Sequence, residues 1–168
     1  MVLTKSELIT MLQHEVRILL HLTTKVDRAQ LDYRPTPKQR STLELLRYLS
    51  MMGPTLVTYV ITGSQDPKIW GDAEALANAR DFEQTIAAIE KQSETYPSLF
   101  ANVSDADLRA ESASASGSKT TRGASLVNVV LCGCAAYRTQ LFLYLKACGR
   151  EELGTMNLWA GMDPPPAS

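Results

Sequence analysis

Glu15 is the residue whose type and position most clearly suggest chemistry. Its side chain is predicted to project into the middle of an apolar stripe on one helix, formed by Leu8, Leu12, Leu19 and Leu22. A lone charge is costly to bury, so this carboxylate must be ion-paired, hydrogen-bonded or protonated.

Partners for Glu15 can come from two other predicted helices. Tyr48 and Tyr137 are placed to donate hydroxyl hydrogen bonds, and Arg138 or Arg47 is placed to supply a counter-charge. Three interpretations stay open. The group is a buried polar cluster that stabilises the fold, or it is a catalytic site in which Glu15 is a general base of raised pKa and a tyrosine is the acid, or Glu15 reaches solvent.

Candidates for binding a small molecule are His14, Arg138 and Cys134. His14 lies on the flank of its helix, where a surface or interface role is an alternative. The other histidine, His21, is two turns away, or roughly 10 Å along a helix. The two imidazoles therefore cannot share a metal ion without a large distortion.

The three cysteines do not form a metal site or a disulfide framework. Cys132 and Cys134 are two residues apart on a helix, so their side chains diverge. Cys148 lies about 21 Å further along the same helix. Cys134 and Cys148 fall on the apolar face, where cysteine usually acts as a small hydrophobic residue. An odd number of cysteines without a framework favours a reducing, cytoplasmic location.

Length and composition predict one globular domain over residues 1–163, followed by a disordered tail at 164–168. The chain has 168 residues, of which 45% are apolar and 21% charged, as is usual for a globular protein. A net charge of −1 argues against nucleic-acid binding, which needs a basic surface. No cleavable signal is visible, and no unbroken apolar run approaches the roughly 20 residues that cross a bilayer.

Apolar periodicity predicts four amphipathic helices. Capping boxes at Thr4–Glu7 and Ser41–Glu44 open the first two helices, the third begins near Asp81, and the fourth runs from about Gly123 to Cys148. Four helices with one apolar stripe each can only pack on one another, which makes the fold class all-α.

Four features interrupt this pattern. Pro54 is expected to kink the second helix, and Pro97 is expected to interrupt the third helix. Residues 62–80 are expected to form a long connection. The Ser-rich segment 109–123 is compatible with a flexible loop or a short hairpin, and we interpret it as a loop.

Two segments of the chain resemble a known family. The first is Leu31-Asp-Tyr-Arg-Pro-Thr-Pro, followed by Arg40-Ser-Thr-Leu-Glu-Leu-Leu-Arg-Tyr-Leu, which is similar to the junction between the first two helices of DinB-like proteins. Tyr137-Arg-Thr-Gln-Leu-Phe-Leu-Tyr-Leu-Lys is similar to the last helix. The resemblance implies a four-helix bundle of up-down-down-up topology with long connections.

The resemblance also shows where this chain departs from its relatives. Family members commonly hold a divalent metal with three histidines, and the matching positions here are Tyr48, Gly133 and Tyr137. Glycine has no ligating atom, and a neutral tyrosine is a poor zinc or nickel ligand. We therefore expect no metal and no cofactor. The thiol chemistry of metal-bearing relatives, which runs through that metal, loses its main support.

Two functions follow as hypotheses. The first is a DinB-like protein without the metal site, which binds a small ligand or acts as a structural or interaction homodimer. The alternative is a metal-independent acid–base enzyme that acts on a small molecule, with thiol-linked compounds among the candidates, through Glu15 and Tyr137. If Glu15 has only a structural role, Glu15→Leu should retain or increase stability, and Glu15→Ala should be more damaging.

Overall fold

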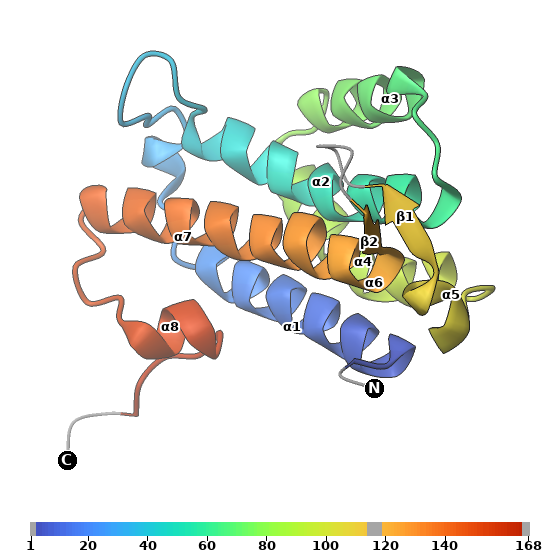
Figure 1. Ribbon diagram of the computed structural model, residues 1–168. Coiled ribbons are helices and arrows are strands. Elements are labelled where there is room, and N and C mark those ends of the chain that lie inside the picture. Colours follow the sequence, from blue (N-terminus) through green and yellow to red (C-terminus); the bar gives the residue numbers. More distant parts are fainter. Residues whose placement is uncertain (1–2, 114–118, 166–168) are drawn as a thin grey trace.

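The structure is a computed structural model that describes residues 3–113 and 119–165. Its fold is a helical bundle (Figure 1). Three of the long helices are α1 (Lys5–Thr23), α2 (Thr42–Thr62) and α4 (Phe82–Leu99). The fourth is continuous through α6 (Arg122–Ser125), a π-helical segment (Leu126–Leu131) and α7 (Cys132–Ala147). The all-α prediction is confirmed, and the π-helical segment is a feature that the sequence analysis missed.

Capping boxes start the bundle helices where the sequence predicts them. The backbone N–H of Thr4 donates to Glu7 at 2.7 Å, and that of Ser41 donates to Glu44 at 2.7 Å. Asp81 caps α4 in the same way. These bonds satisfy backbone donors that the first turn leaves free. The helices α2 and α4 continue through Pro54 and Pro97.

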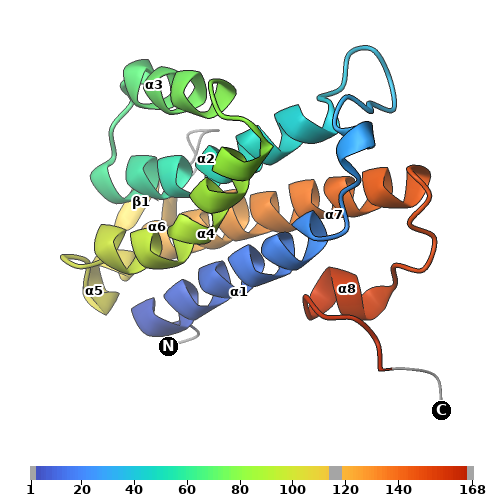
Figure 2. The same cartoon turned by 180° about the vertical axis from the view of Figure 1, so that it is seen from behind.

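The segment expected to be a long connection contains a helix, α3 (Pro67–Asn78). The expectation was wrong because the local start signals were overlooked: Asp66 is the N-cap and Pro67 occupies the first turn. The hydroxyl of Tyr59 links α2 to the start of α3, since it donates to the Asp66 carbonyl at 2.7 Å and accepts from the Trp70 N–H at 3.1 Å. In both views α3 lies outside the four long helices (Figures 1 and 2).

Helix α3 returns the chain so that α2 and α4 run in the same direction. Gln92 donates to the Leu49 carbonyl at 2.9 Å, and four residues further on in each helix Tyr96 lies against Gly53. From the first contacting pair to the second, the residue number rises in both helices, which happens only when two helices run parallel. Antiparallel packing holds for α1 and α4, where Lys5 contacts Phe100 and Gln13 contacts Ser93.

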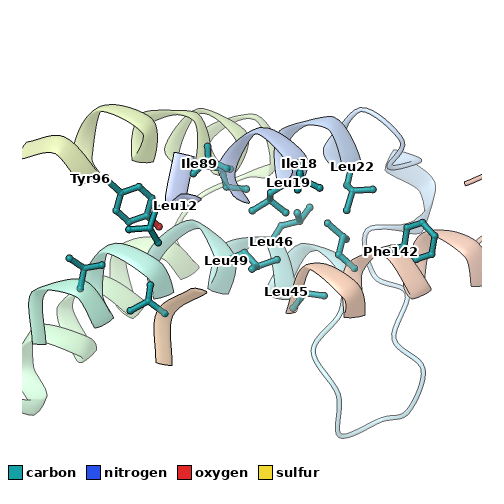
Figure 3. Packing of buried hydrophobic residues seen from close by; sticks show 14 of the residues in the cluster. Leu12, Ile18, Leu19, Leu22, Leu45, Leu46, Leu49, Ile89, Tyr96 and Phe142 are labelled. Atoms are coloured by element: carbon teal, nitrogen blue, oxygen red, sulfur yellow. The ribbon is translucent and has the colours of Figure 1, made fainter. Parts of the chain in front are cut away.

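The core lies between these four helices (Figure 3). Residues from the predicted apolar stripes are almost fully buried, among them Leu8, Leu12, Leu22, Leu45, Leu46, Ile89 and Leu141, whereas Val127, which was expected on the apolar face, is 36% exposed and its neighbour Leu126 is buried instead. Burial of this many large aliphatic side chains is the main force that holds the bundle together.

The Ser-rich segment forms a short hairpin in its described part, so the loop interpretation was wrong. Strands β1 (Glu111–Ala113) and β2 (Lys119–Thr121) pair antiparallel, with Ser112 opposite Thr120. A short helix, α5 (Asp105–Arg109), precedes it. Residues 114–118, which belong to the predicted loop, lie outside the described residues.

The C-terminal segment folds back across α1. Gly149, at φ 93°, ends α7 as predicted, and the chain then forms α8 (Thr155–Trp159) beside α1 (Figure 2). Gly161, at φ 63°, lies so close to α1 that a Cβ there would approach the Ile18 Cα to 2.9 Å. Of the predicted disordered tail, Pro164 and Pro165 are exposed, and residues 166–168 lie outside the described residues.

One helix has the length and composition of a membrane span. It covers Arg122–Ala147, with a mean hydropathy of 1.4, and 28% of its most apolar window is buried. The sequence analysis counted only unbroken apolar runs and so did not single it out. Here the helix is one of the four that enclose the core, and the expectation of no membrane association stays a prediction.

Candidate functional site

Glu15 and Arg138 form an ion pair between α1 and α7. The Arg138 Nε lies 2.9 Å from Oε2 of Glu15, and the Arg138 Nη2 donates to Oε1 at 3.3 Å. The two side chains are only 16% and 5% exposed. Of the two counter-charges that the sequence offered, Arg138 is the partner. Arg47 instead donates to the Arg80 carbonyl at 2.7 Å.

This ion pair is poorly aligned. Although Nε and Oε2 are within ion-pair distance, the N–H is not directed at the carboxylate, and neither atom has a well-formed hydrogen bond among the described residues. The rest of the guanidinium is engaged elsewhere: Nη1 donates to the Leu158 carbonyl, and the group lies 5.8 Å from the centre of the Trp159 ring. Arg138 thus joins α1, α7 and α8.

A groove of 780 Å³ opens on the outer side of the ion pair. Its walls come from α1, α7 and α8, and its main apolar contacts are Met11, Ile18, Leu131, Ala135 and Trp159. Its size and mostly apolar walls are typical of a small-molecule site.

His14 connects the groove wall to the C-terminal segment. Its Nε2 lies 3.1 Å from the Trp159 carbonyl, and its Nδ1 lies 2.5 Å from Nη2 of Arg17. A carbonyl can only accept and a guanidinium can only donate, so the ring carries its proton on Nε2. His14 therefore positions Trp159, and both of its nitrogens are occupied.

On its inner side Glu15 borders a very small cavity that is lined by both apolar and polar side chains. A cavity of 10 Å³ lies among Glu15, Gln92, Tyr96 and Cys134. The Tyr96 hydroxyl donates to Oε1 of Gln92 at 3.1 Å. Burial raises the pKa of the Cys134 thiol to about 12, with the Glu15 charge adding to the effect. Cys134 is thus a protonated thiol behind the ion pair and does not line the groove.

Burial also raises the pKa of Glu15 above its ordinary value. The Arg138 charge opposes the shift but does not cancel it. A carboxyl group of raised pKa beside a groove is the state that a general base needs.

Tyr48 and Tyr137 lie together at a different place. Their ring centres are 4.8 Å apart in an edge-to-face contact, and neither residue lines the groove or the inner cavity beside Glu15. Burial, followed by the neighbouring Tyr137, raises the pKa of Tyr48. The catalytic roles predicted for Glu15, Tyr48 and Tyr137, and the binding roles predicted for His14, Arg138 and Cys134, stay predictions.

The positions that the sequence resemblance matches to metal-binding histidines are occupied by Tyr48, Gly133 and Tyr137. Two phenol rings pack against each other there, and a Cβ on Gly133 would meet the methyl carbon of Met52 at 3.6 Å. No group of three His, Cys, Asp or Glu side chains comes together within residues 3–113 and 119–165. The side chains at the three matched positions themselves supply no imidazole and no carboxylate.

Comparison with solved structures decides the fold. The bundle is similar to the crystal structure of a DinB-like protein, YjoA, from Bacillus subtilis, with a TM-score of 0.64 over 88% of this chain and 96% of that one. The chain has the DinB-like fold. Sequence identity is 15%, so the likeness concerns architecture alone. No family model matches the sequence, and a search of curated proteins finds no match either.

Within this DinB-like bundle the sequence analysis found the ion pair but missed its surroundings. Gln92 and Tyr96 follow Ile89 on the buried face of α4, so helical spacing could have placed them in the core. Trp159 is 65% exposed, and no local pattern could show that it borders a groove built from two distant helices.

Proposed function

We propose that this DinB-like chain binds an amphipathic small molecule in the groove between α1, α7 and α8. The supporting observation is the 780 Å³ groove itself, with apolar walls and an ion pair at its base. The ion pair neutralises most of the charge at the base, and the Trp159 ring forms one wall. These features suit a ligand with an apolar body.

Charge favours a ligand with one anionic group. Glu15 and Arg138 balance each other, while Arg17 at the groove has no carboxylate within ion-pair distance among residues 3–113 and 119–165. Its guanidinium retains donors that are not used by His14 and can accept a carboxylate or sulfonate.

The experiment is a calorimetric titration with 8-anilinonaphthalene-1-sulfonate, an apolar ring system with one sulfonate. We expect one bound molecule per chain. Ala135→Trp, which fills the groove, and Trp159→Ala, which removes a wall, should each weaken binding about tenfold. Leu76→Ala is the matched control, because Leu76 is also 65% exposed but lies on α3. The proposal would be rejected if both groove variants bound the compound with the same affinity as the parent chain.

The raised pKa of Glu15 favours acid–base catalysis as a second candidate function. Tyr137 does not line the groove, so this alternative is argued from Glu15 alone. Turnover of a bound compound that disappears in Glu15→Gln, while its affinity is retained, would favour the enzyme. Unchanged turnover in that variant would reject it.

We further propose that the chain forms a homodimer through the face that carries the groove. Large apolar side chains are exposed on the helices that build the groove, namely Met11 on α1, Leu143 on α7, and Met156 and Trp159 on α8. A soluble protein rarely leaves so many grouped apolar residues uncovered. A second copy packed on this face would also deepen the groove.

Light scattering after size exclusion tests the homodimer. We expect twice the mass of the 18.5 kDa chain. Leu143→Glu should yield monomers, because Leu143 is 57% exposed and a buried unpaired charge opposes association. Leu76→Glu on α3 is the control and should stay dimeric. A monomeric parent protein would contradict this proposal and leave the ligand proposal intact.

A further inference from the structure

Aromatic rings gather around Tyr48, away from the groove. The ring of Tyr137 lies 4.8 Å from that of Tyr48, and the ring of Trp70 lies 5.9 Å from it, both measured between centres. These rings come from α7 and α3, so three separate elements meet here.

A cation of the chain itself lies over this ring. The guanidinium carbon of Arg40 is 3.9 Å from the centre of the Tyr48 ring and 5.9 Å from that of Tyr137. In the described part of the chain no carboxylate is within ion-pair distance of Arg40. The Arg40 side chain is therefore held at this position mainly by the aromatic surface. Its backbone is fixed separately, since its carbonyl accepts a hydrogen bond from Tyr144 at 3.1 Å.

A hollow of 180 Å³ adjoins the stacked guanidinium. Two carboxylates, those of Glu44 and Glu74, line it together with the amide of Asn78. Glu44 is also paired with Arg34 at 3.3 Å. Glu44 is held in place by the Ser41 N–H at 2.7 Å, and this hydrogen bond keeps its pKa below the ordinary value. No ion pair of Glu74 occurs within residues 3–113 and 119–165.

We propose that this hollow is a binding site for a small organic ammonium ion, which stacks on Tyr48 in place of Arg40. An electron-rich ring face with carboxylates around it attracts an alkylated ammonium group, which is weakly hydrated and easily leaves water. The Arg40 guanidinium shows that the ring face accepts a positive charge. Its exposed, flexible side chain can move into solvent while its backbone stays anchored to Tyr144.

The site does not depend on the groove beside Glu15, because the two share no lining residue. Its two carboxylates exclude the anionic ligand proposed for the groove. Its volume limits the bound group to a small head such as a trimethylammonium or a short alkylammonium.

The test is a proton NMR titration of the full chain with tetramethylammonium, with tert-butanol as the neutral compound of similar shape. Arg40→Ala removes the competing cation and should bind tetramethylammonium about fivefold more tightly than the parent chain. Lys38→Ala removes an equal charge from the same loop and should leave the affinity unchanged. In Arg40→Ala the methyl protons of the bound cation should shift upfield, because they lie over a ring.

Two further variants in the Arg40→Ala background separate the ring from the carboxylate. Tyr48→Phe keeps the ring and should retain binding, whereas Tyr48→Leu should lose about fivefold or more. Glu74→Gln should weaken binding about twofold and reduce its salt dependence. The proposal is overturned if Arg40→Ala does not bind tetramethylammonium more tightly, or if tert-butanol binds equally well. If Tyr48→Leu does not fold, Arg40→Ala still tests the role of the ring. The proposal is also overturned if the methyl protons of the bound cation do not shift upfield in Arg40→Ala.

Discussion

Arg138→Met is expected to lower the free energy of unfolding by about 3–5 kcal/mol, the usual cost of removing one partner of a buried ion pair. The change leaves the Glu15 carboxylate without its counter-charge and the Leu158 carbonyl without its donor. Urea unfolding followed by circular dichroism measures the loss. Arg17→Met, an exposed arginine at the groove, is the matched control and should change stability by less than about 0.5 kcal/mol.

The pH dependence of the stability of Arg138→Met shows whether the lost counter-charge causes the destabilisation. Glu15 has a pKa above 4.5 in the folded chain, so its favourable contribution is present below that value and is lost as the pH rises through the raised pKa. Without Arg138 the pKa rises further, and the penalty is therefore largest at neutral pH and smaller near pH 5. A deficit that is independent of pH would show that Arg138 acts through packing alone.

The double variant Glu15→Leu with Arg138→Met should recover most of the lost stability, since a matched apolar pair removes both charges. Glu15→Leu alone is now expected to be destabilising. The sequence analysis expected it to retain or increase stability if Glu15 is structural, but Arg138 is 4% exposed and always charged. The double variant separates loss of the ion pair from loss of the fold.

Gly53→Ala is the second change with a large expected effect, a loss of about 1–3 kcal/mol from overpacking. A Cβ on Gly53 would lie 2.2 Å from the Tyr96 hydroxyl. Tyr96 is 1% exposed, and its hydroxyl is bonded to Gln92, so the ring cannot move aside. The better helix propensity of alanine, about 0.5–1 kcal/mol, offsets only part of this.

Tyr96→Phe provides the matching test. Phenylalanine removes the oxygen that clashes, and the ring carbon behind it is at 3.4 Å from the added Cβ, close to ordinary contact. Gly53→Ala should therefore cost clearly less in the Tyr96→Phe background. Equal losses in both backgrounds, measured by the same urea unfolding, would reject the close contact as the cause.

The fold was predictable from the sequence because its signals are local. The capping boxes at Thr4 and Ser41 and the glycine at 149 each act within one turn of a helix, and the apolar stripes follow from helical spacing. The segment between α2 and α4 was harder, because its Trp and Gly residues suggested a loop and outweighed the cap at Asp66.

The site was predictable only in part because it is assembled from distant segments. A carboxylate in an apolar stripe demands a partner, and Arg138 was one of the two counter-charges that the sequence offered. Helical spacing cannot show the rotation of α7, which places Tyr137 against Tyr48 and away from Glu15. The contact of Arg138 with Leu158 needs the C-terminal chain to fold back, which no short-range pattern indicates.

The way in which α8 is anchored has a consequence for how this protein can change. Arg138 and His14 hold the main-chain oxygens of Leu158 and Trp159, and every amino acid supplies such an oxygen. The identity of residue 159 can therefore be altered while the segment stays attached. Substitutions at residue 159, in evolution or by design, can therefore change one wall of the groove and its ligand preference while the fold is retained.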